Sequence, residues 1–312
     1  MLLTSLGTPA LWIGFTLFVL AMLALDLGVF HRKAHVITVR EATIWSIVWT
    51  LLAVAFGAGV WSLAGAERGL EFFTGWVIEK TLSVDNIFVI VMLFGAFSIP
   101  AIYQHRVLFW GILGALVMRA LFIWAGAELL EHFHWTIYVF GALLLLTGIK
   151  MLLLRQGHKD PAQTLPVRMA RRVLPMTDGL RGQKFWVREG GKLLATPLFL
   201  VLVVVEFTDL IFAVDSIPAI FAVTKDPFLV YTANVFAILG LRSLYFLLAG
   251  VVDRFVYLKT GLALVLVFVG AKMALMDVYK VEISTSLLIV ATLIGGSIAA
   301  SLVATRRRVL TA

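Results

Sequence analysis

Apolar residues form runs long enough to cross a lipid bilayer, and short polar or basic segments separate these runs. About 20 consecutive apolar residues span the hydrocarbon core as a helix. The pattern therefore predicts an all-α membrane protein with about nine transmembrane helices. The predicted helices cover Pro9–Phe30, Ala42–Ala64, Leu70–Phe97, Val107–Leu130, Ile137–Leu154, Leu193–Val223, Phe228–Gly250, Gly261–Met276 and Ile283–Ala304.

Composition supports a single membrane-embedded unit over residues 1–312. We expect a multi-pass protein of the inner (plasma) membrane. The chain is 61% hydrophobic and 14% charged, with a mean hydropathy of +1.00. A soluble chain of this length carries nearly twice that share of charge, about 25%. Cysteine is absent, which excludes disulfides and thiolate metal sites. The net charge of +8 lies in loops that contact the lipid bilayer, so it is no nucleic-acid signal.

The positive charges predict the orientation of the chain. Basic residues gather in the loops after the first, third, fifth and seventh predicted helices and in the C-terminal tail. The longest of these loops, residues 155–192, holds nine basic residues against three acids. Because positively charged loops stay in the cytoplasm, we expect the N-terminus outside and the C-terminus inside.

Five carboxylates lie inside the predicted membrane segments: Glu79 and Asp85 in the third helix, and Glu206, Asp209 and Asp215 in the sixth. One charged carboxylate near the bilayer centre costs roughly 2.5–3.5 kcal/mol on insertion scales. Lipid-facing packing cannot offset five such groups. These acids must therefore face a protein interior, a water-filled cavity or a bound cation.

Arg119 and Arg242 also lie inside predicted membrane segments, where they are natural partners for the acids. An acid–arginine network that only holds helices together is the alternative to an ion pathway. Five acids outnumber two arginines, however, which leaves negative charge for a cation. Asp26 lies near the cytoplasmic end of the first helix and is either an accessory site residue or a boundary residue that reaches the headgroups.

The third to fifth helices, residues 70–154, share signals in the same order with the sixth to eighth, residues 193–277. Each unit has three helices, so the second copy enters the membrane from the opposite side. Inverted repeats of this kind in secondary transporters place the site near the midplane, where the copies meet. The matched segments are Val84-Asp-Asn-Ile87 with Val214-Asp-Ser-Ile217, Arg119-Ala-Leu-Phe122 with Arg242-Ser-Leu-Tyr245, and Gly148-Ile-Lys-Met151 with Gly270-Ala-Lys-Met273.

The spacing of the acids predicts irregular helices. A step of six residues leaves Glu79 and Asp85 about 120° apart around a regular helix. The same holds for Asp209 and Asp215, and Pro218 removes a backbone donor just beyond them. We therefore expect the third and sixth helices to bend or unwind at these motifs, so that all the acids reach one cavity.

The two acidic motifs, together with Leu25-Asp-Leu27, resemble the TerC family, which includes the bacterial Alx proteins. The resemblance extends over nearly the whole chain. It implies an integral membrane protein that exports manganese or a related divalent cation, with the five acids in the ion pathway. Tellurium resistance gave the family its name, and a tellurium-resistance-associated role remains an alternative.

The chemistry of the motifs agrees with a hard cation. The five acids, with Asn86 and Ser216 as neutral oxygen ligands, form an oxygen-only set that suits Mn²⁺, Mg²⁺ or Ca²⁺. We therefore expect a secondary transporter that exports Mn²⁺, with protons as the counter-ion. The sequence contains no protease or phosphate-loop motif, so we expect neither an enzyme nor a bound cofactor. A non-transporting factor that helps other membrane or secreted proteins mature is the second candidate, and the oligomeric state is open.

Overall fold

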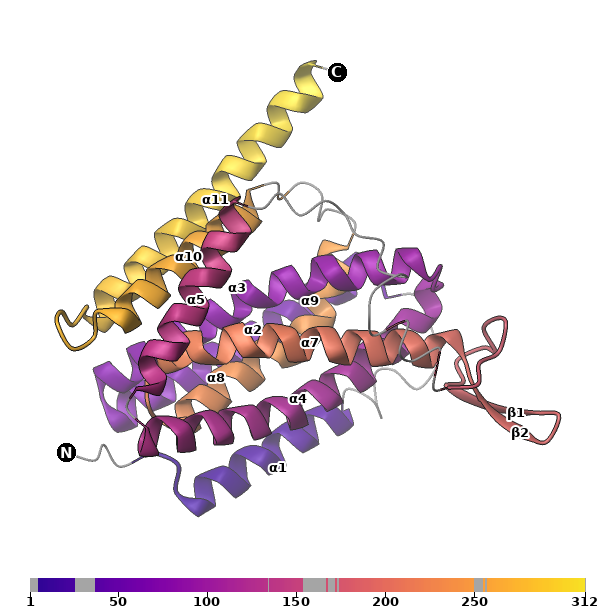
Figure 1. Cartoon of the computed structure of the whole chain (residues 1–312), viewed down its shortest axis with the longest axis horizontal. Helices are drawn as coiled ribbons and strands as arrows, with labels where there is room; N and C mark the ends of the chain where they lie inside the picture. The colour runs from indigo at the N-terminus through magenta and orange to yellow at the C-terminus, as the bar shows by residue number, and fades with distance from the viewer. Residues whose placement is uncertain are drawn as a thin grey trace.

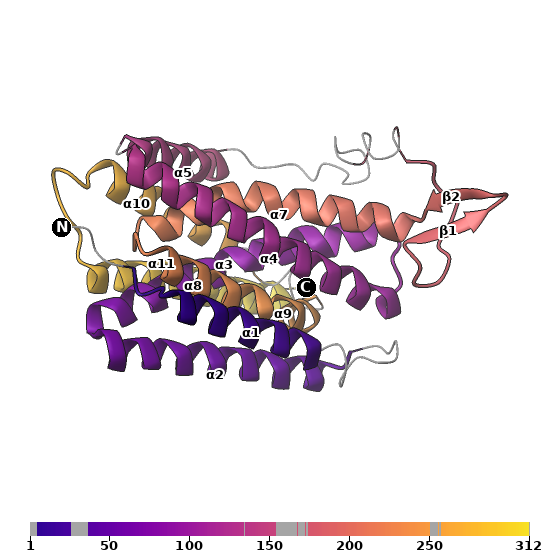
Figure 2. The ribbon, with the colours of Figure 1, turned by 90° about the horizontal axis from the view of Figure 1, so that it is seen from below.

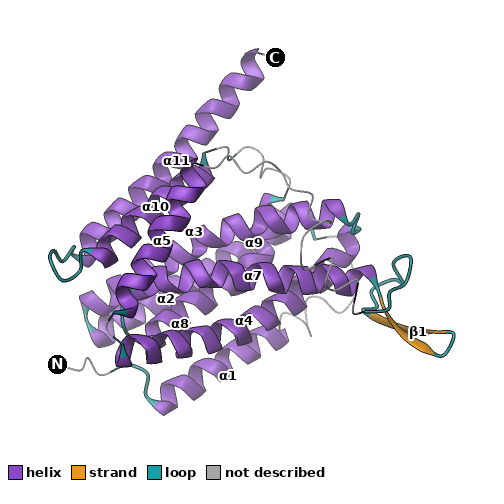
Figure 3. Ribbon diagram, viewed as in Figure 1, coloured by secondary structure: helices purple, strands orange, loops and turns teal. Residues whose placement is uncertain are grey.

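The computed structural model describes residues 5–25, 37–133, 135–153, 167, 172, 174–249, 255 and 257–311, with side chains up to residue 305. Within these residues the chain is a helical bundle with one small β-hairpin (Figures 1 and 3). The all-α prediction is confirmed. The helices are α1 (Pro9–Leu25), α2 (Val39–Ala64), α3 (Ala66–Ala96), α4 (Ala101–His132), α5 (Thr136–Leu153), α7 (Pro197–Phe221), α8 (Pro227–Leu239), α9 (Leu241–Leu248), α10 (Leu258–Ala274) and α11 (Ile283–Thr311).

Among the described residues, six helical segments are long and apolar enough to cross a membrane. These are α2, α4, α5, α7, the joined α8–α9 segment and the first part of α11. The molecule is therefore an integral multi-pass membrane protein. α3, with 31 residues, is long enough to cross a membrane, but it carries more charge because it holds the first acidic motif.

α3 and α7 are continuous helices, so the predicted bends at the acidic motifs are wrong. Pro218 lies in the last turn of α7, where its missing amide costs one ladder bond and leaves most of the helix intact. In α3, Glu79 and Asn86 are seven residues apart and share a face, and Asp85 lies about 100–120° around the helix from them. All three nevertheless line the same cavity. A straight helix can therefore direct all three side chains toward one cavity.

The predicted seventh helix is broken, and the sixth begins later than expected. Gly240 separates α8 from α9, whereas α4 runs without a break through the matching part of the first repeat. Residues 193–195, predicted as helix, belong to a strand instead. α7 starts at Pro197 after the N-cap Thr196, because proline favours the first turn of a helix and cannot donate within one.

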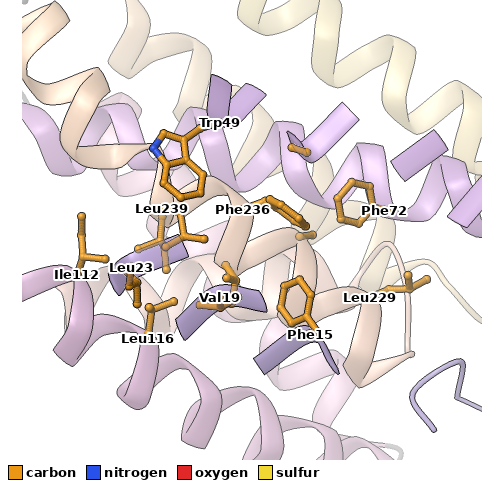
Figure 4. Close-up of a cluster of buried hydrophobic side chains, with 14 of the residues drawn as sticks. Phe15, Val19, Leu23, Trp49, Phe72, Ile112, Leu116, Leu229, Phe236 and Leu239 are labelled. Atoms are coloured by element: carbon orange, nitrogen blue, oxygen red, sulfur yellow. The ribbon is translucent and has the colours of Figure 1, made fainter. Parts of the chain in front are cut away.

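An apolar core joins α1, α2, α3, α4 and α8 (Figure 4). Phe15 on α1 packs edge-on against Phe236 on α8, with ring centroids 5.7 Å apart. Phe72 on α3 lies 6.2 Å from the same ring in a T-shaped arrangement. α8 is buried along almost its whole length, so this cluster fixes it in the centre of the bundle.

α5 and α10 cross in close antiparallel contact, and with α11 they lie oblique to the other helices in Figure 1. A Cβ atom on Gly270 would lie 2.8 Å from the carbonyl oxygen of Gly141. A Cβ atom on Gly148 would lie 2.8 Å from the carbonyl oxygen of Ala263. The two backbones therefore touch, and only glycine fits at these crossing points.

A β-hairpin projects from the end of the bundle, beyond the start of α7 (Figure 2). Its strands, β1 (Trp186–Glu189) and β2 (Lys192–Ala195), pair in antiparallel register. Trp186 anchors the hairpin, because its ring centroid lies 4.5 Å from that of Phe199 on α7. The turn uses Gly190 and Gly191 at positive φ, as tight hairpins require.

The hairpin gives a direct test of the predicted orientation. Because the chain has no cysteine, single labels can be introduced at Lys192 in the hairpin and at Val278 between α10 and α11; both positions are exposed. We expect a membrane-impermeant maleimide to label Val278→Cys in intact cells, and to label Lys192→Cys only after the membrane is permeabilised. The reverse labelling pattern would show that the predicted orientation is wrong.

Candidate metal and ion site

Arg119 on α4 is the centre of a buried charge cluster between α3, α4 and α7. Its guanidinium donates to Glu79 on α3 through Nη1, and to Asp209 on α7 through Nε and Nη2 at 3.1 and 2.9 Å. Ser216 Oγ lies 3.4 Å from Nη1. Arg119 and Glu79 are almost completely buried. Arg119 therefore pairs with one acid from each motif, which is the role of counter-ion that the sequence analysis expects.

α3 and α7 cross antiparallel at their acidic motifs. Asn86 donates to Asp209 Oδ1 at 3.2 Å, and Glu79 meets Ser216 through the shared Arg119 guanidinium. The motif alignment equates Glu79 with Asp209 and Asn86 with Ser216. Each of the two contacts is therefore the counterpart of the other, with the two helices exchanged.

Asp85 and Asp215 line one cavity, which we call the Asp85–Asp215 cavity. Its volume is about 40 Å³, enough for a small number of water molecules or a metal ion. Thr147 on α5 donates to Asp215 Oδ1 at 3.1 Å. Lys259 and Lys150 lie within electrostatic range of Asp85 and Asp215 respectively. The polar lining consists of Glu79, Asp85, Asn86, Arg119, Asp215 and Ser216.

Several oxygens of α3, three of them on residues that line this cavity, lack a hydrogen-bond partner within the described part of the chain. They are Oε2 of Glu79, Oγ of Ser83, Oδ1 of Asp85 and Oδ1 of Asn86, all buried. Buried polar atoms are normally paired, so each unpaired oxygen requires an explanation such as a water molecule or an ion. Oxygens of this type are the ligands that hard divalent cations prefer.

Two of the acids, Glu79 and Asp209, are arranged around an arginine. Among the described residues, no three carboxylates or imidazoles converge closely enough to hold a metal. Glu79 and Asp209 are paired with Arg119, whereas Asp85 and Asp215 line the cavity beside this pair, together with Glu79. A metal ion that uses all four acids must therefore compete with the Arg119 guanidinium.

The remaining predicted residues lie outside this centre. Glu206 packs against Gly114 of α4, where a larger residue would collide with its carboxylate, and its buried Oε2 has no hydrogen-bond partner among described residues. Arg242 on α9 is buried, and its Nη1 lies 3.3 Å from His105 Nδ1. Asp26 falls outside the described residues. Arg242 thus has a different environment from Arg119, its match in the first repeat.

Sequence reasoning missed Thr147, Ser83 and Gly114 as parts of the site. Thr147 directly precedes Gly148 of the matched segment, and Ser83 lies between Glu79 and Asp85 in the sequence. Their positions near the motifs were visible. Their contacts depend on how α4, α5 and α7 pack, which no local pattern encodes.

The fold and the site define a class: a polytopic α-helical membrane protein with charged groups buried between helices at membrane depth. Comparison with known families then identifies it more closely. The model of the integral membrane protein TerC family matches residues 64–309, so the chain belongs to the TerC family.

The relatives agree with this assignment. An uncharacterized membrane protein from Myxococcus xanthus is 58% identical over 97% of this chain and 95% of its own length. A putative membrane-bound redox modulator, Alx, from Escherichia coli K12 is 50% identical over 91% of this chain and 92% of its own length. An uncharacterized membrane protein from Rickettsia felis is 42% identical over 94% of this chain and 97% of its own length. No solved structure matches the chain.

Proposed function

We propose that this protein is a secondary transporter of the inner (plasma) membrane that exports a divalent metal cation, with Mn²⁺ as the preferred cargo. The chain crosses the membrane nine times, with the N-terminus outside. The cargo binds near the midplane to carboxylates from α3 and α7, and protons move in exchange.

The observation that carries the proposal is the Asp85–Asp215 cavity. It gathers acids from both motifs, together with buried oxygens that lack partners among the described residues. The acids come from helices that cross deep in the bundle. Intramembrane acids in such a position mark ion pathways. Their hard oxygen ligands suit Mn²⁺, Mg²⁺ or Ca²⁺ better than Zn²⁺ or Cu²⁺.

Two sets of contacts support an inverted repeat formed by residues 70–154 and 193–277. At the α3–α7 crossing, the Asn86–Asp209 contact is the counterpart of the Ser216–Glu79 contact. At the α5–α10 crossing, the alignment that equates Gly148 with Gly270 also equates Gly141 with Ala263. The Gly141–Gly270 and Gly148–Ala263 contacts are therefore equivalent. Transporters built this way alternate access by moving one repeat against the other.

Proton exchange follows from the chemistry of the acids. Carboxylates crowded into a site with little water cannot all remain ionised when the cation leaves. They take up protons at that step and release them when the next cation binds. A proton gradient can then drive the cation against its own gradient.

The word redox in the names of the Alx relatives describes those proteins. This chain contains no cysteine, so thiol–disulfide exchange is not available to its own residues. We therefore propose cation transport for this chain, and we do not transfer the redox description of the Alx relatives to it.

Flux through purified protein tests the proposal. Proteoliposomes with an acidic lumen should take up Mn²⁺ from a more alkaline medium, because protons leaving the lumen drive exchange. Reversing the pH gradient should suppress uptake, and an ionophore that collapses the gradient should abolish the difference. Parallel measurements with Mg²⁺ and Ca²⁺ rank the cargo. Uptake no faster than in protein-free vesicles, for all three ions, would contradict a transport function.

A further inference from the structure

Lys259 lies in the first turn of α10, on the face of that helix that meets the Asp85–Asp215 cavity. Leu262 and Leu266 of α10 line the cavity. Residues three and seven positions apart lie on one side of a helix, so Lys259 begins the stripe to which both leucines belong. Lys259 itself is exposed. Its side chain therefore stands between the cavity and the predicted cytoplasmic end of the bundle, from which an exported cation arrives.

An aromatic ring of α3 holds the ammonium group of Lys259 close to Asp85. Its Nζ lies 5.4 Å from the centroid of the Phe88 ring. Asp85 and Phe88 are three residues apart on α3, so their side chains are neighbours on the surface of that helix. Lys259 is accordingly the positive group whose charge acts on Asp85. The flexible four-carbon stem of lysine allows the ammonium group to reach either the ring or the carboxylate.

Asp85 has a carboxylate oxygen that needs a positive partner. Its Oδ1 is buried and has no hydrogen-bond partner among the described residues. The matching acid of the second repeat differs, because Asp215 Oδ1 accepts a hydrogen bond from Thr147 at 3.1 Å. A buried carboxylate without a donor or a cation is costly. Asp85 is therefore the acid of the cavity that most requires a cation when no cargo is bound.

We propose that Lys259 supplies the cation of Asp85 whenever the site holds no cargo. Its ammonium group leaves the face of Phe88, binds Oδ1 of Asp85 and closes that side of the cavity. A divalent cation carries twice the charge and binds several oxygens at once, so it displaces the ammonium group back to the ring. Lys259 and the cargo thus compete for one acid, and Lys259 acts as a positioning residue.

This inference rests on the proposed function, because it describes how the transporter returns after the cargo has left. An unpaired charge at membrane depth is costly, so a carrier with an ionised, unpartnered Asp85 returns slowly. Lys259 pairs this acid in the empty carrier. In the loaded carrier the cargo pairs it instead. The return of the empty carrier therefore depends on Lys259, and the crossing of the loaded carrier does not.

Net uptake and isotope exchange separate these two steps. Net uptake of Mn²⁺ into proteoliposomes requires the empty carrier to return in every cycle, whereas exchange of radioactive for unlabelled Mn²⁺ uses only the loaded carrier. Lys259→Gln should lower net uptake at least about tenfold, because an unpaired charge at membrane depth is disfavoured by more than that factor. Exchange at saturating Mn²⁺ should stay near the wild-type rate. The KM of exchange should fall about threefold to fivefold, since a competing cation of exposed ion-pair strength has been removed.

Three further variants test whether the charge and its resting place are responsible. Lys259→Arg keeps a cation and should restore most of the net uptake. Phe88→Leu removes the ring that holds the ammonium group away from Asp85, so it should raise the KM about twofold to threefold, opposite to Lys259→Gln. Lys192→Gln, on the exposed hairpin, removes a lysine that lies outside the cavity lining and should change neither rate.

The inference is overturned if K259Q lowers net uptake and exchange by the same factor, as a purely structural role predicts, or if it changes neither. It is also overturned if K259Q and F88L move the KM in the same direction. F88L retains the lysine, so its KM provides the test even where K259Q accumulates poorly.

Failure of this inference is separable from failure of the proposed function. If wild-type protein shows neither net uptake nor exchange of a divalent cation, the transport proposal fails. If wild-type protein transports and the ratio of net uptake to exchange is the same in K259Q, transport stands and the role of Lys259 fails.

Discussion

Asp85→Asn and Asp215→Asn should each abolish cation flux while the protein accumulates at near-normal levels. The two acids occupy matching positions and line one cavity, where each offers charge to a single cation. Replacement by asparagine keeps the size and one carbonyl oxygen but removes the charge. Because the affinity of a site for hard cations depends on its number of charged ligands, either loss weakens binding strongly.

The double variant should transport no less than either single variant, as expected for residues that act as one unit. Glu131→Gln is the matched control, since it removes one acid from the exposed end of α4. The measurement is initial Mn²⁺ uptake normalised to reconstituted protein. Retained flux in both single variants would refute the shared site. An assembly factor that does not transport should tolerate both substitutions.

The membrane class and the order of the helices could be predicted because they depend on local features. Runs of apolar residues determine where helices cross, and the insertion cost of Glu79, Asp85, Glu206, Asp209 and Asp215 indicates that they face the interior. The break at Gly240 could not be predicted. A single glycine inside an apolar run is compatible with a continuous helix, and packing around it decides the outcome.

The candidate site was predicted as a set of residues but not as a geometry. The six-residue spacing suggested bent helices because it assumed that both acids of a motif must lie on one face. In the structure, α3 and α7 cross as continuous helices, and the cavity extends around α3 far enough to reach Asp85. The choice of Arg119 over Arg242 depends on side chains from three helices meeting at one point. The spacing of residues within one helix does not show which side chains from different helices come into contact.

Arg119→Ala should lower both stability and transport. Arg119 is about 1% exposed and binds Glu79 and Asp209, so its removal leaves two carboxylates buried without their cation. Breaking a buried ion pair by removing one partner costs up to about 3–5 kcal/mol. We expect a marked fall in the thermal unfolding temperature in detergent. Arg181→Ala is the control: Arg181 binds Glu189 on the exposed hairpin, where removing the pair should change stability little.

Removing the stranded charge should distinguish a counter-ion from a packing residue. Asp209→Asn in the Arg119→Ala background eliminates one unpaired carboxylate, so it should recover part of the lost unfolding temperature although it deletes a further interaction. Flux should not recover, because the site has lost a charged ligand. If Arg119 served only to fill space between α3, α4 and α7, the second substitution would bring no recovery. Arg119→Lys should rescue poorly if Arg119 is a counter-ion, since an ammonium cannot reproduce the forked contact with Asp209. Recovery of stability by D209N, together with its failure to restore flux, would identify Arg119 as the counter-ion of the buried acids.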